Sequence, residues 1–311
     1  MPMPDVSGVL LVDKPVGPTS FEVVQRVRRA LGVRKAGHTG TLDPNASGLL
    51  PVCLGEATRI VPFLVAGTKS YRGTVRLGVV TDTLDSAGQV LQTRDPSGVS
   101  RASLEAALAR LTGVQQQIAP MYSAKRVGGR RLYELARAGE AVEREAFEVT
   151  VDEARLEEFA PPDATIFVRC SKGTYIRSLA ASLGETLGCG AHLAALRRLS
   201  SGTLDIESAT SLEAIEREPA AAKPLSIDDA LTHLPALQLD ERQAISVSFG
   251  NGLTPEDHAR LQLPSLAAGA LARLVDPAGQ VVAVGESNGE RSVRLVRVLR
   301  GRVGPGTHRR A

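Results

Sequence analysis

One acidic residue stands alone in a segment that is otherwise uncharged. The segment reads AGHTGTLDPNASGLLP from residue 36 to residue 51, and Asp43 is the only formally charged residue between Lys35 and Glu56. Pro44 disfavours helical geometry at the residue before it and so restricts Asp43 to an extended backbone. A sheltered carboxylate can act as a nucleophile, or can stabilise positive charge that develops on a sugar carbon. Asp43 is therefore the first candidate for a catalytic group.

An ordinary structural explanation for Asp43 also exists. Asp-Pro-Asn is common turn chemistry, in which the carboxylate accepts a hydrogen bond from the backbone two residues further on. The uncharged surroundings argue against a plain turn, since a carboxylate withdrawn from water needs a compensating partner. A guanidinium is a suitable partner because it stays protonated and forks onto a carboxylate. We therefore expect an arginine from elsewhere in the chain to meet Asp43.

Basic residues gather in separate stretches although the formal net charge is only +3. Residues 22–35 and 121–137 each contain five basic residues against one glutamate, and residues 290–311 contain seven arginines against one. A fourth acid-poor stretch contains Lys172, Arg177, Arg197 and Arg198. A single stretch of this kind is usually a solvated helix face, but four of them predict a surface that holds a polyanion such as a nucleic acid.

Composition excludes several classes of protein. The 311 residues are 43% hydrophobic, and no apolar run approaches the length of a membrane helix. The N-terminus lacks the layout of a signal peptide. The three cysteines are far apart, which argues against a disulfide framework and a metal site. We expect no membrane association, no metal and a reducing, cytoplasmic location.

The apolar pattern predicts a mixed α+β fold. Short apolar or alternating runs at 8–15, 70–94 and 164–170 indicate strands, and helical spacing indicates helices at 100–113 and 173–188. A further helix begins after Thr19, which can form a capping box with Glu22. This helix is expected to bury Phe21, Val24, Val27 and Leu31. Asp82 and Asp85 fit the turn of the 70–94 hairpin, and Lys14 is expected to support the floor of a pocket.

The order of several motifs resembles the TruB family of tRNA pseudouridine synthases. The motifs cover most of residues 8–203 and are GVLLVDKPVGPTSFEVV, KAGHTGTLDPNASGLLPVCLGEATR, KSYRG, RLGVVTDTLDSAG, IAPMYSAKRVGGRRLYELARAG, CSKGTYIRSLAASLG and GCGAHLAALRRL. The resemblance implies conversion of uridine to pseudouridine at position 55 in the T-loop of tRNA. The N1–C1′ bond is cut and the flipped uracil is rejoined through C5, without a cofactor.

The resemblance also implies roles for individual residues and a division into domains. Asp43 matches the catalytic aspartate, Tyr71 the tyrosine that stacks on the target base, and Arg177 the arginine that pairs with the aspartate. Tyr175 and Leu196 match residues of the uracil pocket, and His38 a histidine associated with T-loop docking. The expected domains are a pseudouridine synthase-like catalytic domain (1–236, with a basic inserted thumb at about 120–150), a small β-rich PUA-like RNA-binding domain (237–303) and a basic tail (304–311).

Three other functions are weighed against this one. A hydrolase or glycosylase with paired carboxylates would need a second sheltered acid, and the sequence shows none. A non-catalytic RNA-binding protein, such as a tRNA chaperone, would explain the basic stretches but not Asp43. A pseudouridine synthase that uses a guide RNA, acting on ribosomal RNA, is disfavoured because the 120–150 insertion is typical of the stand-alone enzymes. We expect a monomer that binds the T-arm of tRNA and needs no guide RNA.

Overall fold

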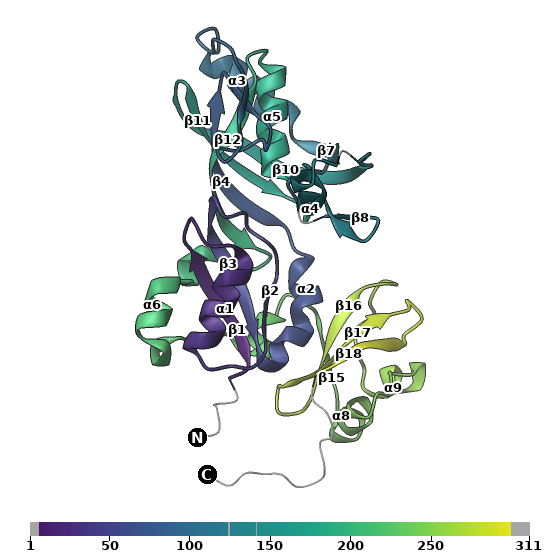
Figure 1. Cartoon of the computed structure of the whole chain (residues 1–311). Coiled ribbons are helices and arrows are strands. Elements are labelled where there is room, and N and C mark those ends of the chain that lie inside the picture. Colours follow the sequence, from purple (N-terminus) through teal and green to yellow (C-terminus); the bar gives the residue numbers. More distant parts are fainter. Residues whose placement is uncertain (1–5, 124, 141, 300–311) are drawn as a thin grey trace.

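The computed structural model describes residues 6–123, 125–140 and 142–299, and it has the mixed α+β architecture that the sequence predicts (Figure 1). The helices are α1 (Ser20–Ala30), α2 (Val61–Val65), α3 (Arg101–Arg110), α4 (Leu132–Arg137), α5 (Ile176–Thr186), α6 (Leu212–Arg217), α7 (Ile227–Ala230), α8 (Glu241–Ser248) and α9 (Pro255–Arg260), with short 3-10 helices at Gly55–Ile60, Ile206–Ser208 and Pro219–Ala221. The strands are β1 (Gly8–Lys14), β2 (Ala36–His38), β3 (Ala46–Leu54), β4 (Lys69–Leu77), β5 (Val79–Thr81), β6 (Val90–Thr93), β7 (Gly113–Ile118), β8 (Arg126–Val127), β9 (Arg130–Arg131), β10 (Ala146–Ala160), β11 (Asp163–Cys170), β12 (Ala191–Ser201), β13 (Leu204–Asp205), β14 (Thr210–Ser211), β15 (Ala236–Gln238), β16 (Leu271–Val275), β17 (Val281–Ser287) and β18 (Val293–Val298).

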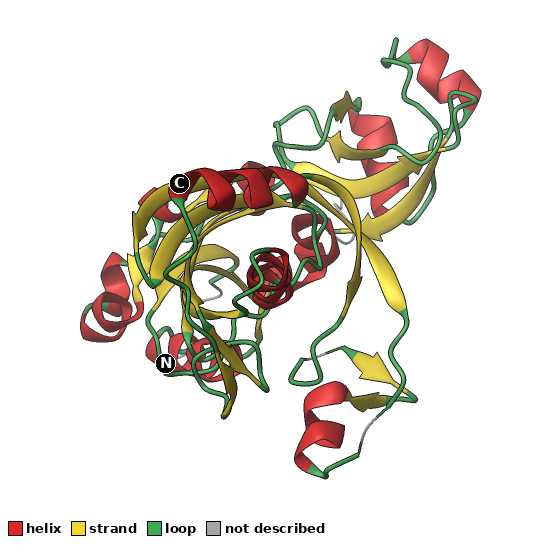
Figure 2. Cartoon of the chain, turned by 90° about the horizontal axis from the view of Figure 1, so that it is seen from above, coloured by secondary structure: helices red, strands yellow, loops and turns green. Residues whose placement is uncertain are grey.

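A single large sheet connects the two halves of the main body. Its strand order is β14-β1-β3-β12-β4-β11-β10-β7, with β2 paired to β3 and β13 to β12. Strand β12 lies at the junction, because it pairs parallel to β3 on one side and antiparallel to β4 on the other. Figure 2 shows that the strands curve around helices instead of forming a flat layer. The catalytic candidates lie where this curved sheet changes from one half to the other.

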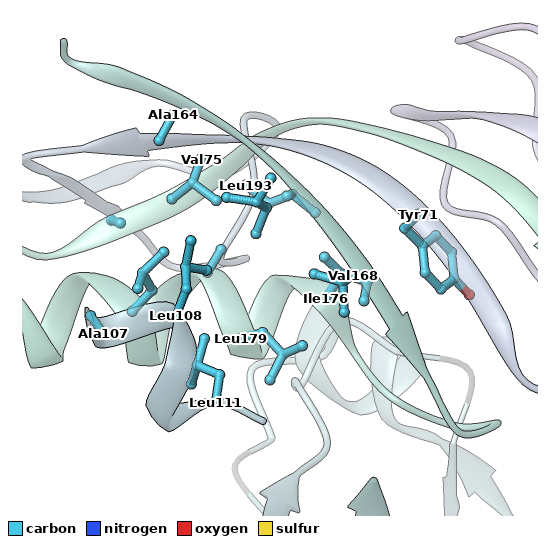
Figure 3. Close-up of a cluster of buried hydrophobic side chains, with 14 of the residues drawn as sticks. Tyr71, Val75, Ala107, Leu108, Leu111, Ala164, Val168, Ile176, Leu179 and Leu193 are labelled. Atoms are coloured by element: carbon cyan, nitrogen blue, oxygen red, sulfur yellow. The ribbon is translucent and has the colours of Figure 1, made fainter. Parts of the chain in front are cut away.

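Each half has an apolar core of its own, between its helices and the sheet. In one half, α3 and α5 pack on the sheet through a cluster that includes Ala107, Leu108, Leu179 and Val168 (Figure 3). In the other half, α1 packs on β1 and β3 through a cluster that includes Val23. Both cores are made by strands and helices that are far apart in the sequence, so the sheet register determines which polar residues meet at its centre.

Helix α1 has the predicted N-terminus and buries Val24 and Val27 as predicted, but it does not bury Phe21. Thr19 and Glu22 form the expected capping box. The buried positions are Ser20, Val23, Val24 and Val27. Phe21 was expected to be buried but is 66% exposed, because it lies about 100° around the helix from Ser20, outside this stripe. An aromatic ring is thereby left on the surface of α1.

Gly48 allows the close contact between β3 and β12. Its φ is +100°, and a Cβ atom at this position would lie 2.3 Å from the carbonyl oxygen of Arg198. Any side chain would push the two strands apart. The parallel pairing of Gly48 with Arg198 therefore depends on glycine, and this pairing brings β12 beside the candidate site.

The C-terminal strands form a second sheet, in the order β15-β16-β17-β18, with an apolar core of its own. A second cluster joins this sheet to the main body, since Val281 and Val284 pack in the same cluster as Leu49 and Leu231. The expected boundary between residues 236 and 237 lies within β15. The expected basic tail, 304–311, lies outside the described residues. No helix in the described ranges is long and apolar enough to cross a membrane.

Within the segment expected to be a thumb, residues 120–150, the described part before β10 forms a small projecting element. In its described part, β8 and β9 make a hairpin that leads into α4. Leu132 and Leu135 of α4 pack with Ala119 in a separate small core. Figures 1 and 2 show this thumb and the C-terminal sheet projecting from the same side of the main body. The side chains of Phe147 and Tyr175 pack against the core of the thumb and so hold it against the main body.

Candidate active site

Asp43 lies in the loop between β2 and β3, and the neighbouring backbone holds this loop in place. The hydroxyl of Ser20 in α1 accepts a hydrogen bond from the Leu42 backbone N–H (2.8 Å) and donates one to the Leu42 carbonyl (2.9 Å). The N–H of Ala46 bonds to the carbonyl of Asp43 at 3.0 Å, closing the turn that Pro44 favours. The side chain of Asp43 remains 40% exposed, so it lies at a surface that a substrate can reach.

Lys14, at the end of β1, holds the same loop through hydrogen bonds to its backbone. It is fully buried, and its Nζ donates to the carbonyls of Ala46 (2.6 Å), Pro15 (3.0 Å), Asp43 (3.2 Å) and Pro44 (3.4 Å). Burial lowers the pKa of Lys14 to about 8, although the charge of Asp43 acts in the opposite direction. One ammonium group thus organises the backbone around the catalytic candidate.

Arg177 is the predicted partner of Asp43. It is the second residue of α5, is 5% exposed, and its Nε lies 3.0 Å from Oδ2 of Asp43. Its other nitrogens donate to the carbonyls of Thr83 (3.0 Å) and Tyr122 (2.8 Å). Arg177 therefore joins the Asp43 loop to the β5–β6 connection and to the base of the thumb.

A second carboxylate also faces Arg177, contrary to the expectation from the sequence. Oδ2 of Asp85 lies 3.5 Å from Nη1 of Arg177, and Asp85 is 8% exposed. Its Oδ1 accepts hydrogen bonds from the Thr83 hydroxyl (2.6 Å) and the Ala87 N–H (3.0 Å). Asp85 is the turn residue that was expected, but its turn folds onto β12 through Leu193, which brings the carboxylate to the site. Nothing in the sequence spacing from Asp43 reveals this.

The surroundings of Asp43 make its ionised form less favourable. Loss of water around the carboxyl group raises the pKa of Asp43, the positive charge of Arg177 lowers it, the negative charge of Asp85 raises it, and Lys14 lowers it. The balance is a raised pKa, which is typical of functional carboxyl groups in partly closed sites.

The side chains converge on one small pocket that is open to solvent. Its lining consists of Asp43, Asn45, Ala46, Asp85, Arg177 and the β12 residues Leu193, Ala194, Ala195 and Leu196. Leu196 was predicted to line a base pocket, and it forms part of this apolar wall. Within the described ranges, no three His, Cys, Asp or Glu side chains are grouped as metal ligands.

Tyr71 lies in β4, at one end of the apolar core that α3 and α5 form with the sheet (Figure 3). It is 8% exposed, and its hydroxyl points away from the other labelled side chains. Burial raises the pKa of Tyr71, while the charge of Arg198 lowers it and the negative charge of Asp43 raises it. The phenol thus lies within electrostatic range of the catalytic candidate.

His38 and Tyr175, the remaining candidates, lie at the edges of the site. His38 ends β2 and its Nδ1 accepts a hydrogen bond from the Gly40 N–H at 3.3 Å; burial lowers its pKa. Tyr175 precedes α5 and packs edge-on against Phe147, with ring centroids 6.2 Å apart. Its backbone is held by Gln117. Tyr175 is therefore tied to the base of the thumb and is not among the residues that line the pocket.

The fourth basic stretch is not a surface patch. Arg177 and Arg198 are 5% and 1% exposed, and Arg197 pairs with Asp13 at 2.8 Å. The first stretch does reach the surface, since Arg28, Arg29 and Arg34 line a shallow hollow with Gln25, Gly32 and Val33. Alternation along β12 explains the difference between Arg197 and Arg198, because adjacent strand residues point to opposite faces. A count of charges along the sequence cannot separate these cases.

Comparison with known proteins agrees with this geometry. A family model described as "TruB family pseudouridylate synthase (N terminal domain)" matches residues 28–176, and one described as "tRNA pseudouridylate synthase B C-terminal domain" matches residues 177–234. A tRNA pseudouridine synthase B from Pseudomonas aeruginosa (strain UCBPP-PA14) is 42% identical over 95% of this chain and 96% of its own. A protein of the same name from Burkholderia pseudomallei (strain 668) is 48% identical over 85% of each chain.

Solved structures show the same fold. The crystal structure of a Cbf5-Nop10-Gar1 complex contains a chain with a TM-score of 0.73 and 27% identity, covering 94% of this chain and 85% of its own. A chain of an H/ACA RNP bound to a substrate RNA has a TM-score of 0.72 and 25% identity, covering 95% of this chain and 86% of its own. The family matches and the two curated relatives confirm the resemblance seen in the sequence: the chain belongs to the TruB family of pseudouridylate synthases.

Proposed function

We propose that this protein isomerises uridine to pseudouridine in tRNA, at position 55 of the T-loop. The observation that carries the proposal is the pairing of Asp43 with Arg177 in an open pocket of a TruB-family chain. The relatives that are 42% and 48% identical are named tRNA pseudouridine synthase B, which supports tRNA as the substrate. The T-arm as the docking site and position 55 as the target come from the motif resemblance.

The reaction breaks the N1–C1′ bond and forms a C1′–C5 bond. The hydrogen on C5 leaves as a proton and N1 gains one, so the composition of the nucleotide does not change. A base inside a folded RNA must first leave its stack and enter a pocket. The carboxylate of Asp43 is then available either to attack C1′ or the uracil ring or to stabilise charge on the sugar, and Arg177 holds it in place.

Tyr71 is proposed to stack on the target base and to take part in proton transfer. We expect Tyr71→Phe to lower single-turnover pseudouridine formation by about 100-fold or more, the scale of a positioned proton donor or acceptor. Tyr71→Ala should in addition weaken RNA binding by about 1–3 kcal/mol through lost stacking. Near-normal turnover by the Phe variant would mean that stacking is the whole role of Tyr71.

The raised pKa of Asp43 predicts the acid side of the pH–rate profile. The rate requires the carboxylate, so it should fall as pH decreases through the pKa of Asp43, which lies above the ordinary value of 3.8. Replacing Asp85 by Asn removes a negative neighbour, which lowers the pKa of Asp43 and should move this limb to lower pH. Rates measured from pH 4.5 to 8 in both proteins check the direction. A shift to higher pH in the Asn variant would contradict the assignment.

Affinity for tRNA is expected to fall steeply with salt, because phosphate contacts release counterions. Arg28 and Arg34 line the exposed hollow at the end of α1 and are expected to contact phosphates. Replacing either arginine by Ala should reduce the slope of log affinity against log salt concentration by about 1. Arg76 serves as the control, since its guanidinium is bound to Asp163 at 2.7 Å. A flat salt response of the unchanged protein would contradict docking through the basic residues.

Two alternatives are distinguished by specific observations. A guide-RNA-dependent synthase is supported by the fold match to chains of a Cbf5-Nop10-Gar1 complex and of an H/ACA RNP, but those chains are only 27% and 25% identical. A tRNA chaperone without chemistry does not require the Asp43–Arg177 pair.

We propose that the protein acts as a monomer in the cytoplasm and that the 237–303 unit is a PUA-like domain that binds RNA away from the pocket. Residues 1–236 would then form the catalytic domain.

The test is to incubate the purified protein alone with an unmodified tRNA transcript and map pseudouridine at single-nucleotide resolution. The expected result is one modified position, U55. A transcript with cytidine at position 55 should remain unmodified. No pseudouridine without added guide RNA, or modification only of ribosomal RNA, would contradict the proposal. Refolding of tRNA without any pseudouridine would favour the chaperone.

A further inference from the structure

Arg198 is a buried arginine beside the pocket for which the mechanism above gives no role. It lies in β12, where it pairs with Gly48 of β3 and with Tyr71 of β4. Its Nε donates to the carbonyl of Leu49 at 2.7 Å, and its Nη2 donates to the carbonyl of Gly40 at 3.1 Å. With 1% of its surface exposed, Arg198 cannot form part of an RNA-binding surface.

The charge of Arg198 is not neutralised by a neighbouring acid. Within the described ranges, no carboxylate lies within 4.0 Å of its guanidinium. Its charged neighbours are instead Lys14 and Lys69, and its positive charge lowers the pKa of both. A buried cation without a counter-ion destabilises a fold, so its presence here calls for a compensating role.

The adjacent residue provides an internal comparison. Arg197 has the same side chain one position earlier, but it is 40% exposed and bound to Asp13 through two hydrogen bonds of 3.0 and 2.8 Å. Arg197 therefore has the partner expected of a surface arginine. Arg198 has carbonyl partners in the catalytic loop and in β3 instead.

We propose that Arg198 is a positioning residue for the isomerisation, which fixes the Gly40 end of the Asp43 loop and the Tyr71 phenol against one another. Gly40 lies three positions before Asp43. The hydrogen bond from Nη2 to the Gly40 carbonyl therefore fixes the backbone position at the start of the Asp43 loop. The guanidinium lies directly beside this position, since a Cβ atom on Gly40 would be 3.4 Å from Nη1 of Arg198. The planar fork of an arginine suits this task, because it directs several donors at fixed angles.

The side chain of Tyr71 is the second group that Arg198 affects. Burial raises the pKa of Tyr71, the charge of Arg198 on β12 lowers it, and Cys170 at the end of β11 and Asp43 in the loop raise it. Arg198 and Tyr71 are also direct cross-strand neighbours on β12 and β4, so their side chains leave the sheet on the same face. Removal of this guanidinium should therefore raise the pKa of Tyr71 and leave space beside its ring.

The inference rests on the proposed function, so its test includes a measurement that needs no turnover. Arg198→Gln and Arg198→Lys are compared with Arg197→Gln and Arg197→Lys. Single-turnover pseudouridine formation and tRNA affinity are measured for each protein after circular dichroism has confirmed folding. In parallel, protein labelled with ¹³C at the tyrosine Cζ is titrated by NMR, and the Tyr71 signal is assigned with Tyr71→Phe.

The expected result for Arg198→Gln is a rate lower by about 100-fold, the loss that a misplacement of about 1 Å can cause, with tRNA affinity near the wild-type value. Its Tyr71 signal should titrate at higher pH than in the wild type. Arg198→Lys keeps the charge but not the fork, so its rate should also fall. If Arg198→Gln does not fold, Arg198→Lys tests the inference instead, and the expected result is a lower rate together with a changed Tyr71 chemical shift. Both Arg197 variants should behave as the wild type in all three measurements.

A folded Arg198 variant with a wild-type rate would overturn the inference, and so would a reduced rate with an unchanged Tyr71 signal, which would indicate a structural role alone. Failure of the proposed function looks different. In that case the wild type and the Arg197 variants would form no pseudouridine, while the Tyr71 titration would still report whether Arg198 controls the phenol.

Discussion

Arg177→Met is expected to remove most of the turnover and to destabilise the protein. Methionine fills similar space but leaves the carboxylates of Asp43 and Asp85 without their cation and two carbonyls without a donor. Removing one partner from a buried ion pair costs about 3–5 kcal/mol, and the side chains of Arg177 and Asp85 are 5% and 12% exposed. Loss of a fixed charge beside the reacting group should lower the rate by about 10²–10³-fold.

Two further variants identify the cause of this effect. Arg177→Lys keeps the charge but cannot reach Asp43, Asp85 and the carbonyls together, so it should retain stability better than activity. Arg76→Met removes an arginine that pairs with Asp163 at the surface, and exposed pairs contribute only about 0–1 kcal/mol. Single-turnover rates and urea denaturation of the three variants provide the comparison. An Arg177→Met protein with wild-type rate and stability would contradict the assigned role.

The sequence identifies Asp43 well because its isolation is a local property. One carboxylate before a proline in an uncharged segment can be recognised without knowing the fold. The need for an arginine partner also follows from local chemistry. That the partner is Arg177 does not, because residues 43 and 177 meet only when α5 packs against the junction of β3, β12 and β4. The resemblance to a known family supplied that assignment.

Asp85 and Arg198 show where inference from the sequence ends. Asp85 looks like a hairpin residue, and it is one, but the position of its turn over β12 also brings it to Arg177. Arg198 looks like one more basic residue in an exposed stretch. Its burial depends on the strand register, since a shift of one residue would exchange it with Arg197. Register between strands distant in the sequence is not a local property.

The second large effect is expected for Asp43→Asn. The amide has nearly the shape of the carboxylate but no negative charge, so it can neither attack C1′ nor stabilise positive charge there. Single-turnover pseudouridine formation should fall on the order of 10³-fold or more, the range of a group that takes part in chemistry. Affinity for tRNA should stay close to the wild-type value, because docking depends on phosphate contacts and base stacking. The fold should persist, since Arg177 keeps Asp85, Thr83 and Tyr122 as partners.

The most direct test of the central claim is therefore one paired measurement. Wild type and Asp43→Asn, each at saturating concentration, are mixed with the same unmodified tRNA transcript, and pseudouridine at position 55 is followed over time while binding is measured on the same preparations. The structure predicts rapid conversion by the wild type and almost none by the variant, with equal binding. Conversion by Asp43→Asn at a rate close to the wild type would show that Asp43 is only a turn residue and that the chemistry lies elsewhere.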